Sequence, residues 1–140
     1  MNGNGIVRFL LHTPLRGLLG DTMEITVRGR KTGKYYSLPV GFFEQGDCLW
    51  VLSSRDRTWW RNVMGGVPVD LYLRGEPREG LAEPVLDTAE VKDGLDAYLR
   101  RFPGAARSLG VQVEDGKLDA EGARRLARER LFVKIRLSPN

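Results

Sequence analysis

The segment RGRKTGK, residues 28–34, places four cations around a Thr-Gly turn: Arg28, Arg30, Lys31 and Lys34. Cationic side chains and the backbone amides of a tight turn bind phosphate or carboxylate groups. Of the 22 cations and 18 acids in the chain, residues 28–61 carry seven and three, which leaves fifteen of each sign elsewhere. This local excess predicts an anion site, with an ordinary charged hairpin tip as the structural alternative.

A second polar segment, SSRDRTWWRN at residues 53–62, follows an apolar stretch and begins a short helical pattern. Ser53, Ser54 and Arg55 end the expected strand, and Thr58 is suited to cap the helix. The amides and the positive dipole at a helix start attract anions. We therefore expect this segment and the RGRKTGK loop to hold one anionic ligand together.

The adjacent tryptophans at positions 59 and 60 point in different directions from a helix, so at least one is expected in the core. The other is available to cover a flat ring. Trp59 is the better candidate because it shares a helical face with Asn62, three residues later.

Side chains that commonly act in catalysis are scarce. His12 is the single histidine and Cys48 the single cysteine, so neither a Ser–His or Cys–His pair nor a Cys/His metal cluster is supported. Gly-x-Gly-x-x-Gly and Walker lysine motifs are absent. An enzyme of this kind is expected to take its reactivity from a cofactor. A single cysteine also favours a reducing, cytoplasmic location.

The elements that position these residues follow from length and hydrophobic pattern. Residues 1–140 are expected to form a single domain. Alternation predicts strands at 22–29, 35–43, 48–54, 67–74, 81–87 and 131–137. Hairpin connections without a βαβ rhythm predict an antiparallel sheet that closes on itself, with five strands in a meander and the sixth returning after helices. Gly33 is expected at a positive φ, and Pro39 at an edge or bulge.

Two helical segments precede the last predicted strand. Asp87 and Glu90 fit a capping box, and a helical stripe then runs to the FPG sequence at 102–104. A second helix is expected in DAEGARRLARER, residues 119–130.

The N-terminal segment GIVRFLLHTPLRGLLG, residues 5–20, has helical spacing with a break near Pro14. It is too short to span a bilayer and lacks a cleavage site. Two interpretations stay open: a helix that caps the open end of the sheet, or an amphipathic helix resting peripherally on a membrane.

Three stretches together resemble the deazaflavin (coenzyme F420)-dependent nitroreductase family: TVRGRKTGKYYSLPVGF, LWVLSSRDRTWWRNV and GVPVDLYLRG. Members are small split β-barrels related to the flavin-binding pyridoxamine-phosphate oxidase fold. The resemblance implies a mainly β protein: a six-stranded antiparallel split β-barrel with an N-terminal helix and a helical insertion before the last strand.

The resemblance also implies roles for individual residues. The phosphate and polyglutamate tail of F420 would be held by the first loop and the serine-rich segment: Arg30, Lys31, Thr32, Gly33, Ser53, Ser54 and Arg55. The family often has an arginine before its strand proline, where this chain has Tyr36 and Ser37. That tail contact would be either lost or supplied by Arg57 or Arg61. The deazaflavin ring would lie along Pro39, Val40, Gly41, Trp59 and Asn62.

The function implied is hydride transfer from reduced deazaflavin to an electron-poor acceptor such as a quinone, an enone or a nitroaromatic. A proton would come from Tyr36, Ser37 or solvent. The segment FPGAARSLG lacks the tyrosines that the nitroreductase branch carries there, so the acceptor is left open. A homodimer is a further partner to consider.

Three alternative functions stay open. The same barrel could hold FMN, although one phosphate needs fewer cations than a polyglutamate tail. A basic sheet bearing Tyr35, Tyr36, Trp50 and Trp59 could stack single-stranded nucleic acid, but alternation points these rings to both faces. The third rival is a cofactor carrier without turnover.

Overall fold

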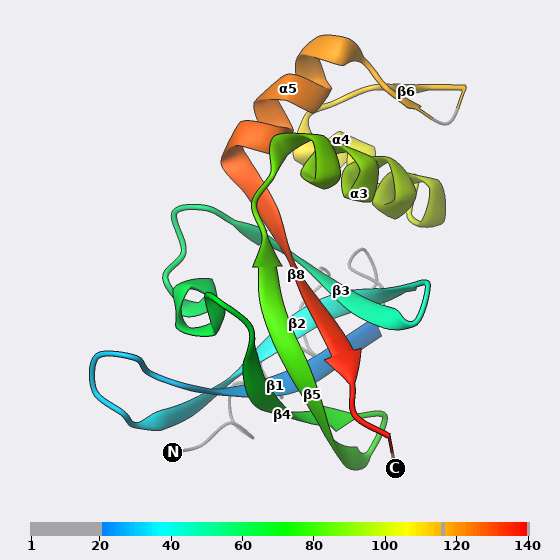
Figure 1. Cartoon of the computed structure of the whole chain (residues 1–140). Helices are drawn as coiled ribbons and strands as arrows, with labels where there is room; N and C mark the ends of the chain where they lie inside the picture. The colour runs from blue at the N-terminus through cyan, green and yellow to red at the C-terminus, as the bar shows by residue number, and fades with distance from the viewer. Residues whose placement is uncertain (1–20, 116, 140) are drawn as a thin grey trace.

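A computed structural model of the chain describes residues 21–115 and 117–139, so the predicted N-terminal helix lies outside the described residues. Within them, six antiparallel strands close a barrel in the order β1-β2-β3-β8-β5-β4 (Figure 1). The strands are β1 (Asp21–Arg28), β2 (Tyr35–Gln45), β3 (Cys48–Ser54), β4 (Val67–Leu73), β5 (Glu76–Val85) and β8 (Arg130–Leu137). The expected mainly β, six-stranded antiparallel barrel is confirmed.

The predicted five-strand meander is wrong. β3 does not pair with β4, because β8 pairs with β3 on one side and with β5 on the other. The chain leaves β3 through a short 3₁₀ helix, η1 (Trp59–Val63), and β4 then pairs with β1 and β5. The fifth strand also begins earlier than residue 81, since the turn is confined to Arg74 and Gly75, both at positive φ. The charged residues Glu76, Arg78 and Glu79 hid the start of this strand because they leave no apolar alternation there, although Glu76 and Arg78 lie opposite the buried Leu73 and Leu71 of β4.

The barrel interior is filled by every second residue of its strands. Ile25 and Val27 of β1 face Val51 of β3 and Val133 of β8 within one apolar cluster. The alternation in LFVKIRL predicts that Leu131, Val133, Ile135 and Leu137 face inward. The first three are fully buried, and Leu137 packs partly buried against the same cluster. The period-2 alternation therefore identified the core face correctly.

The described residues form three α-helices, which lie together on one side of the barrel (Figure 1). They are α3 (Thr88–Arg101), α4 (Ala105–Leu109) and α5 (Ala120–Glu129), with a small hairpin of β6 (Val113–Glu114) and β7 (Lys117–Leu118). The Asp87 side chain accepts from the Glu90 amide at 3.1 Å, as the capping pattern predicts. The helical insertion is confirmed, whereas α4 and the β6–β7 hairpin were not predicted.

Aromatic residues on the outer face of the barrel join it to the helices. Phe132 of β8 is fully buried and packs edge-on against Trp50 and Phe43. Gly94 of α3 lies directly over this cluster: a Cβ there would sit 2.6 Å from a Phe132 ring carbon and 3.1 Å from Trp50. The helix approaches the barrel closely because position 94 has no side chain.

We expect Gly94→Ala to destabilise the fold by about 1–2 kcal/mol, since overpacking costs about 1–3 kcal/mol and alanine's better helix propensity returns up to about 1 kcal/mol. Urea unfolding measures the change. Gly104→Ala is the matched control, because a Cβ there meets nothing within 4 Å and the backbone is helical. Equal stability of the two variants would contradict the close contact.

Candidate functional site

Strands β2 and β3 separate soon after their shared hairpin. In the described strands, β2 pairs with β1 from Tyr35 to Phe42 but with β3 only from Phe43 to Gln45. β3 meanwhile pairs with β8 along its whole length. Residues 38–41 of β2 and 51–54 of β3 therefore face each other without a ladder between them. Pro39, which has no N–H to donate, lies in this unpaired stretch, as its edge assignment predicted.

A cleft of about 320 Å³ occupies this separation. One wall combines the two strand edges with η1: Leu38, Pro39, Val40, Gly41, Val51, Leu52, Ser53, Ser54, Arg57 and Trp59. The opposite wall comes from the helices and the start of β8: Tyr98, Ala105, Ser108, Leu109 and Arg130. Seven predicted ligand-binding residues thus line one cleft: Pro39, Val40, Gly41, Ser53, Ser54, Arg57 and Trp59.

The two tryptophans are both buried but occupy different places. The Trp59 indole donates to the Ser53 hydroxyl oxygen at 3.1 Å and lines the cleft. The Trp60 indole donates to the Ser54 carbonyl at 3.1 Å, its ring lies 4.8 Å from the Arg61 guanidinium, and it is not among the cleft residues. Of the two tryptophans, Trp59 is the one that lines the cleft.

Asn62 joins the β1–β2 loop to η1, which lie on the same side of the barrel (Figure 1). Its carbonyl oxygen accepts from the Arg30 amide at 3.0 Å, and its amide nitrogen donates to the Tyr36 hydroxyl and to the Trp59 carbonyl. Asn62 does not line the cleft. Its side chain is used to hold together the two segments that the sequence predicts to share a ligand.

The candidate proton donors Tyr36 and Ser37 lie on opposite faces of β2, and neither borders the cleft. Tyr36 faces inward beside Val27, whereas the Ser37 hydroxyl shares a 2.6 Å hydrogen bond with Thr26. Burial raises the pKa of the Tyr36 phenol, and the hydrogen bond from Asn62 partly offsets this rise. The structure does not bring these hydroxyls to the cleft.

The RGRKTGK loop closes on itself. Gly33 has φ +73°, as predicted, and its amide donates to the Gly29 carbonyl at 2.7 Å. The Lys34 amide donates to the Thr32 hydroxyl, and Arg28 Nε donates to the Gly33 carbonyl at 3.2 Å. The Gly33 and Lys34 amides are thus used within the turn, and the exposed side chains of Arg30, Lys31 and Lys34 are available to an anion.

Arg55 was predicted to bind the ligand, but its side chain is engaged in contacts within the fold. Its guanidinium donates to three backbone carbonyls at 2.8–2.9 Å, those of Leu86, Ala127 and Arg130. Its own amide donates to the Glu129 carbonyl at 2.9 Å. The side chain therefore braces the end of α5 against the barrel. Arg57, two residues later, is exposed and lines the cleft.

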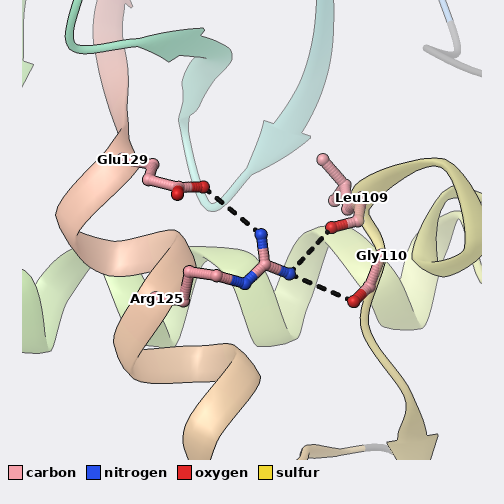
Figure 2. A network of polar contacts seen from close by, with 4 residues as sticks. All are labelled: Leu109, Gly110, Arg125 and Glu129. Carbon is pink, nitrogen blue, oxygen red and sulfur yellow. Dashed lines mark hydrogen bonds and ion pairs between the residues drawn. The ribbon is translucent and has the colours of Figure 1, made fainter.

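The α4 wall of the cleft is fixed by a second arginine. Figure 2 shows Arg125 of α5 donating from one nitrogen to the Leu109 and Gly110 carbonyls, each at 3.1 Å, while another nitrogen meets Glu129 at 3.4 Å. These carbonyls end the five-residue α4, whose last turn would otherwise lack partners. The wall that Ala105, Ser108 and Leu109 present to the cleft is thereby held in place.

Sequence reasoning missed Tyr98, Ser108 and Arg130 as cleft residues. Tyr98 was visible only as one member of the buried stripe of α3. Arg130 follows directly after α5 and lies opposite Ser54 in the β3–β8 ladder, a pairing that no local pattern signals.

The cleft suits a flat, mainly apolar ring that carries an anionic extension. Its walls are aliphatic and aromatic, and Arg57 and Arg130 place two cations on its lining. No group of three or more His, Cys, Asp or Glu residues that could hold a metal occurs in residues 21–115 and 117–139. Over the same residues, no helix is both long and apolar enough to cross a membrane.

Comparisons with known proteins agree with this geometry. The model of the F420H(2)-dependent quinone reductase family matches residues 13–115. A search of curated proteins gives no match. Among solved structures, an F420 reductase is 15% identical, with 89% of this chain and 93% of that chain covered and a TM-score of 0.50.

Two further solved structures are similar in fold. A putative pyridoxamine 5'-phosphate oxidase from Listeria innocua is 13% identical over 89% of this chain and 91% of that chain, with a TM-score of 0.56. A general stress FMN/FAD binding protein from Xanthomonas citri is 15% identical over 84% and 75%, with a TM-score of 0.52. At such identity these likenesses establish the fold alone.

The family match spans both polar segments, the whole cleft wall formed by β2, β3 and η1, and the helices as far as α4. It confirms the resemblance that the loop and tryptophan motifs indicate. The chain belongs to the F420H2-dependent quinone reductase family and is an F420-dependent oxidoreductase.

Proposed function

We propose that the cleft between β2 and β3 holds the deazaflavin ring of F420 and that the protein uses it to reduce a quinone. The observation that carries this proposal is the unpaired stretch of the two strands. Edge N–H and C=O groups there need partners, and the edges of a flat heterocycle supply them. Trp59 closes one side of that space, and the α4 wall closes the other.

The anionic tail of the cofactor is assigned to the exposed cations near the cleft. Arg30 and Lys31 stand on the loop that Asn62 attaches to η1, and Arg57 lies on the cleft wall. Thr32 and Gly33 shape the turn that presents them, and Ser53 and Ser54 line the inner end. Arg55 is left out of this set because its guanidinium already serves three carbonyls.

When bound, reduced F420 supplies a hydride to the acceptor. The protein's own part is to orient, to exclude water and to hold charge. Val51, Leu52 and Leu109 give both walls aliphatic surface, against which a bound ring would displace water. The exposed side chains at its mouth allow an acceptor to enter beside the ring, and the quinone class fits the family to which the chain belongs.

The alternative ligand is FMN, which a structural neighbour is described as binding. Three exposed cations, Arg30, Lys31 and Arg57, favour the longer F420 tail, since a single phosphate needs fewer partners. Stacking of nucleic acid is not proposed. Trp59 is buried beside Ser53, Trp50 packs on Phe132, and Tyr35 alone of the three is exposed.

Titration of the purified protein with F420 and with FMN at equal salt tests the proposed function. We expect the dissociation constant for F420 to be at least about 10-fold lower, because the tail reaches more cations than one phosphate does. Calorimetry gives both constants directly. Equal or reversed affinities would overturn the deazaflavin assignment and favour the flavin alternative.

Replacing Arg30 and Lys31 together by Ala is expected to weaken F420 binding roughly 100-fold, because two charge-assisted contacts contribute about 3 kcal/mol. Stability should change by less than about 0.5 kcal/mol, since both side chains are exposed. The double variant Arg124→Ala/Arg128→Ala removes the same charge from exposed positions on α5. If both double variants weaken binding equally, general charge and not the loop is responsible.

Asn62→Ala is expected to free the β1–β2 loop from η1. The Arg30 amide would lose its acceptor and exchange its proton faster, which hydrogen exchange followed by NMR can measure. F420 affinity should fall as well, although the Asn62 side chain does not line the cleft. Unchanged exchange at Arg30 would show that the loop is held by other contacts.

A further inference from the structure

Tyr98 of α3 borders the cleft from the helical side. Its ring is 3% exposed and is held by edge-on contact with Phe43 and tilted contact with Phe102, at centroid distances of 5.5 and 5.2 Å. Among residues 21–115 and 117–139, its hydroxyl has no hydrogen-bond partner. It is also not one of the polar side-chain atoms of these residues that are both fully buried and without a partner. The phenol is therefore positioned by packing on a residue that lines the cleft, and its hydroxyl is not committed to a hydrogen bond with any of these residues.

The other hydroxyls near the cleft are less suited to give up a proton. The Ser108 hydroxyl donates to the Ala105 carbonyl at 3.0 Å, so its proton is committed within α4. Ser53 and Ser54 are alkyl alcohols, far weaker acids than a phenol, and Ser53 is oriented by the Trp59 indole. Tyr36 and Ser37 do not border the cleft at all.

Arg130 lies on the same wall as Tyr98 and carries a fixed positive charge. Burial raises the pKa of the Tyr98 phenol, and the charge of Arg130 acts in the opposite sense. The phenol is accordingly protonated at neutral pH, while a phenolate formed there would have a neighbouring cation to stabilise it.

We propose that Tyr98 is a catalytic residue that donates a hydrogen bond, and then its proton, to a carbonyl oxygen of the quinone acceptor, with Arg130 stabilising the phenolate. This inference rests on the proposed function, because it requires an acceptor in the same cleft. It assigns the proton-donor role to the helical wall of the cleft and not to β2.

The quinone gains two electrons and one hydrogen as hydride from reduced F420, which is oxidised. The O–H bond of Tyr98 breaks, and the acceptor oxygen takes that proton, so that the quinone becomes a hydroquinone. Water entering the open cleft then returns a proton to the Tyr98 phenolate.

Tyr98→Phe tests the proposal, because phenylalanine keeps the ring contacts with Phe43 and Phe102. The first measurement is calorimetric titration of menadione into the protein loaded with oxidised F420, where no turnover occurs. We expect the menadione dissociation constant to rise about 10-fold from loss of one hydrogen bond. The second is a single-turnover reaction of the F420H2-loaded protein with menadione, where the rate should fall about 100-fold or more.

Tyr72→Phe is the matched control, since this tyrosine is 54% exposed on β4 and lies outside the cleft. It should change neither measurement. Unchanged menadione affinity and rate in Tyr98→Phe, with F420 binding intact, would overturn the inference and leave the proposed function standing. Reduced affinity with an unchanged rate would overturn the proton transfer. Failure of the unaltered protein to bind F420 would overturn both the proposed function and the inference.

Discussion

The early end of the β2–β3 ladder is the constraint on which the rest of the molecule depends. The backbone groups of a barrel strand are normally hydrogen-bonded to a neighbouring strand on each side. On one side β2 pairs with β1 from Tyr35 to Phe42, but on the other side it pairs with β3 only from Phe43 to Gln45. β3 is kept in place by its complete pairing with β8. The barrel thus keeps its closure while leaving two strand edges available to a ligand, and the cleft is part of the sheet itself.

Several long-range polar contacts hold the rim of this opening. Asn62 attaches the cationic loop to η1, Arg55 braces the end of α5 on the barrel, and Arg125 fixes the end of α4. In each of these contacts, a polar side chain forms a hydrogen bond with a backbone group that has no partner within a helix or a strand ladder. The cations that predicted an anion site therefore divide into two groups: some, such as Arg55, stabilise the fold, whereas Arg30, Lys31 and Arg57 stay exposed.

The sequence predicted what depends on local pattern. Alternation located all six strands and the inward face of β8, and the Asp87–Glu90 spacing located the start of α3. Strand order was not predictable, because nothing within residues 130–137 says that they lie between β3 and β5. The role of Arg55 was missed for the same reason: its acceptors lie 31 to 75 residues away along the chain. The helical stripe of α3 indicates that Tyr98 is a core residue, and its ring is buried. The proposed role of its hydroxyl depends on the cleft beside it, which no local pattern indicates.

The place of β8 has a consequence for how the barrel folds. This strand follows the helices in the chain and fills the space between β3 and β5, with Val51 opposite Val133. Until β8 docks, the edges of β3 and β5 that it pairs with lack a partner, and the pairing of β1 with β4 is what joins the first three strands to the β4–β5 hairpin. The wall that β3 gives to the cleft is set only once β8 has docked. The cleft is therefore complete only after this long-range pairing has formed, and until then the two unpaired edges are open to pairing with another chain.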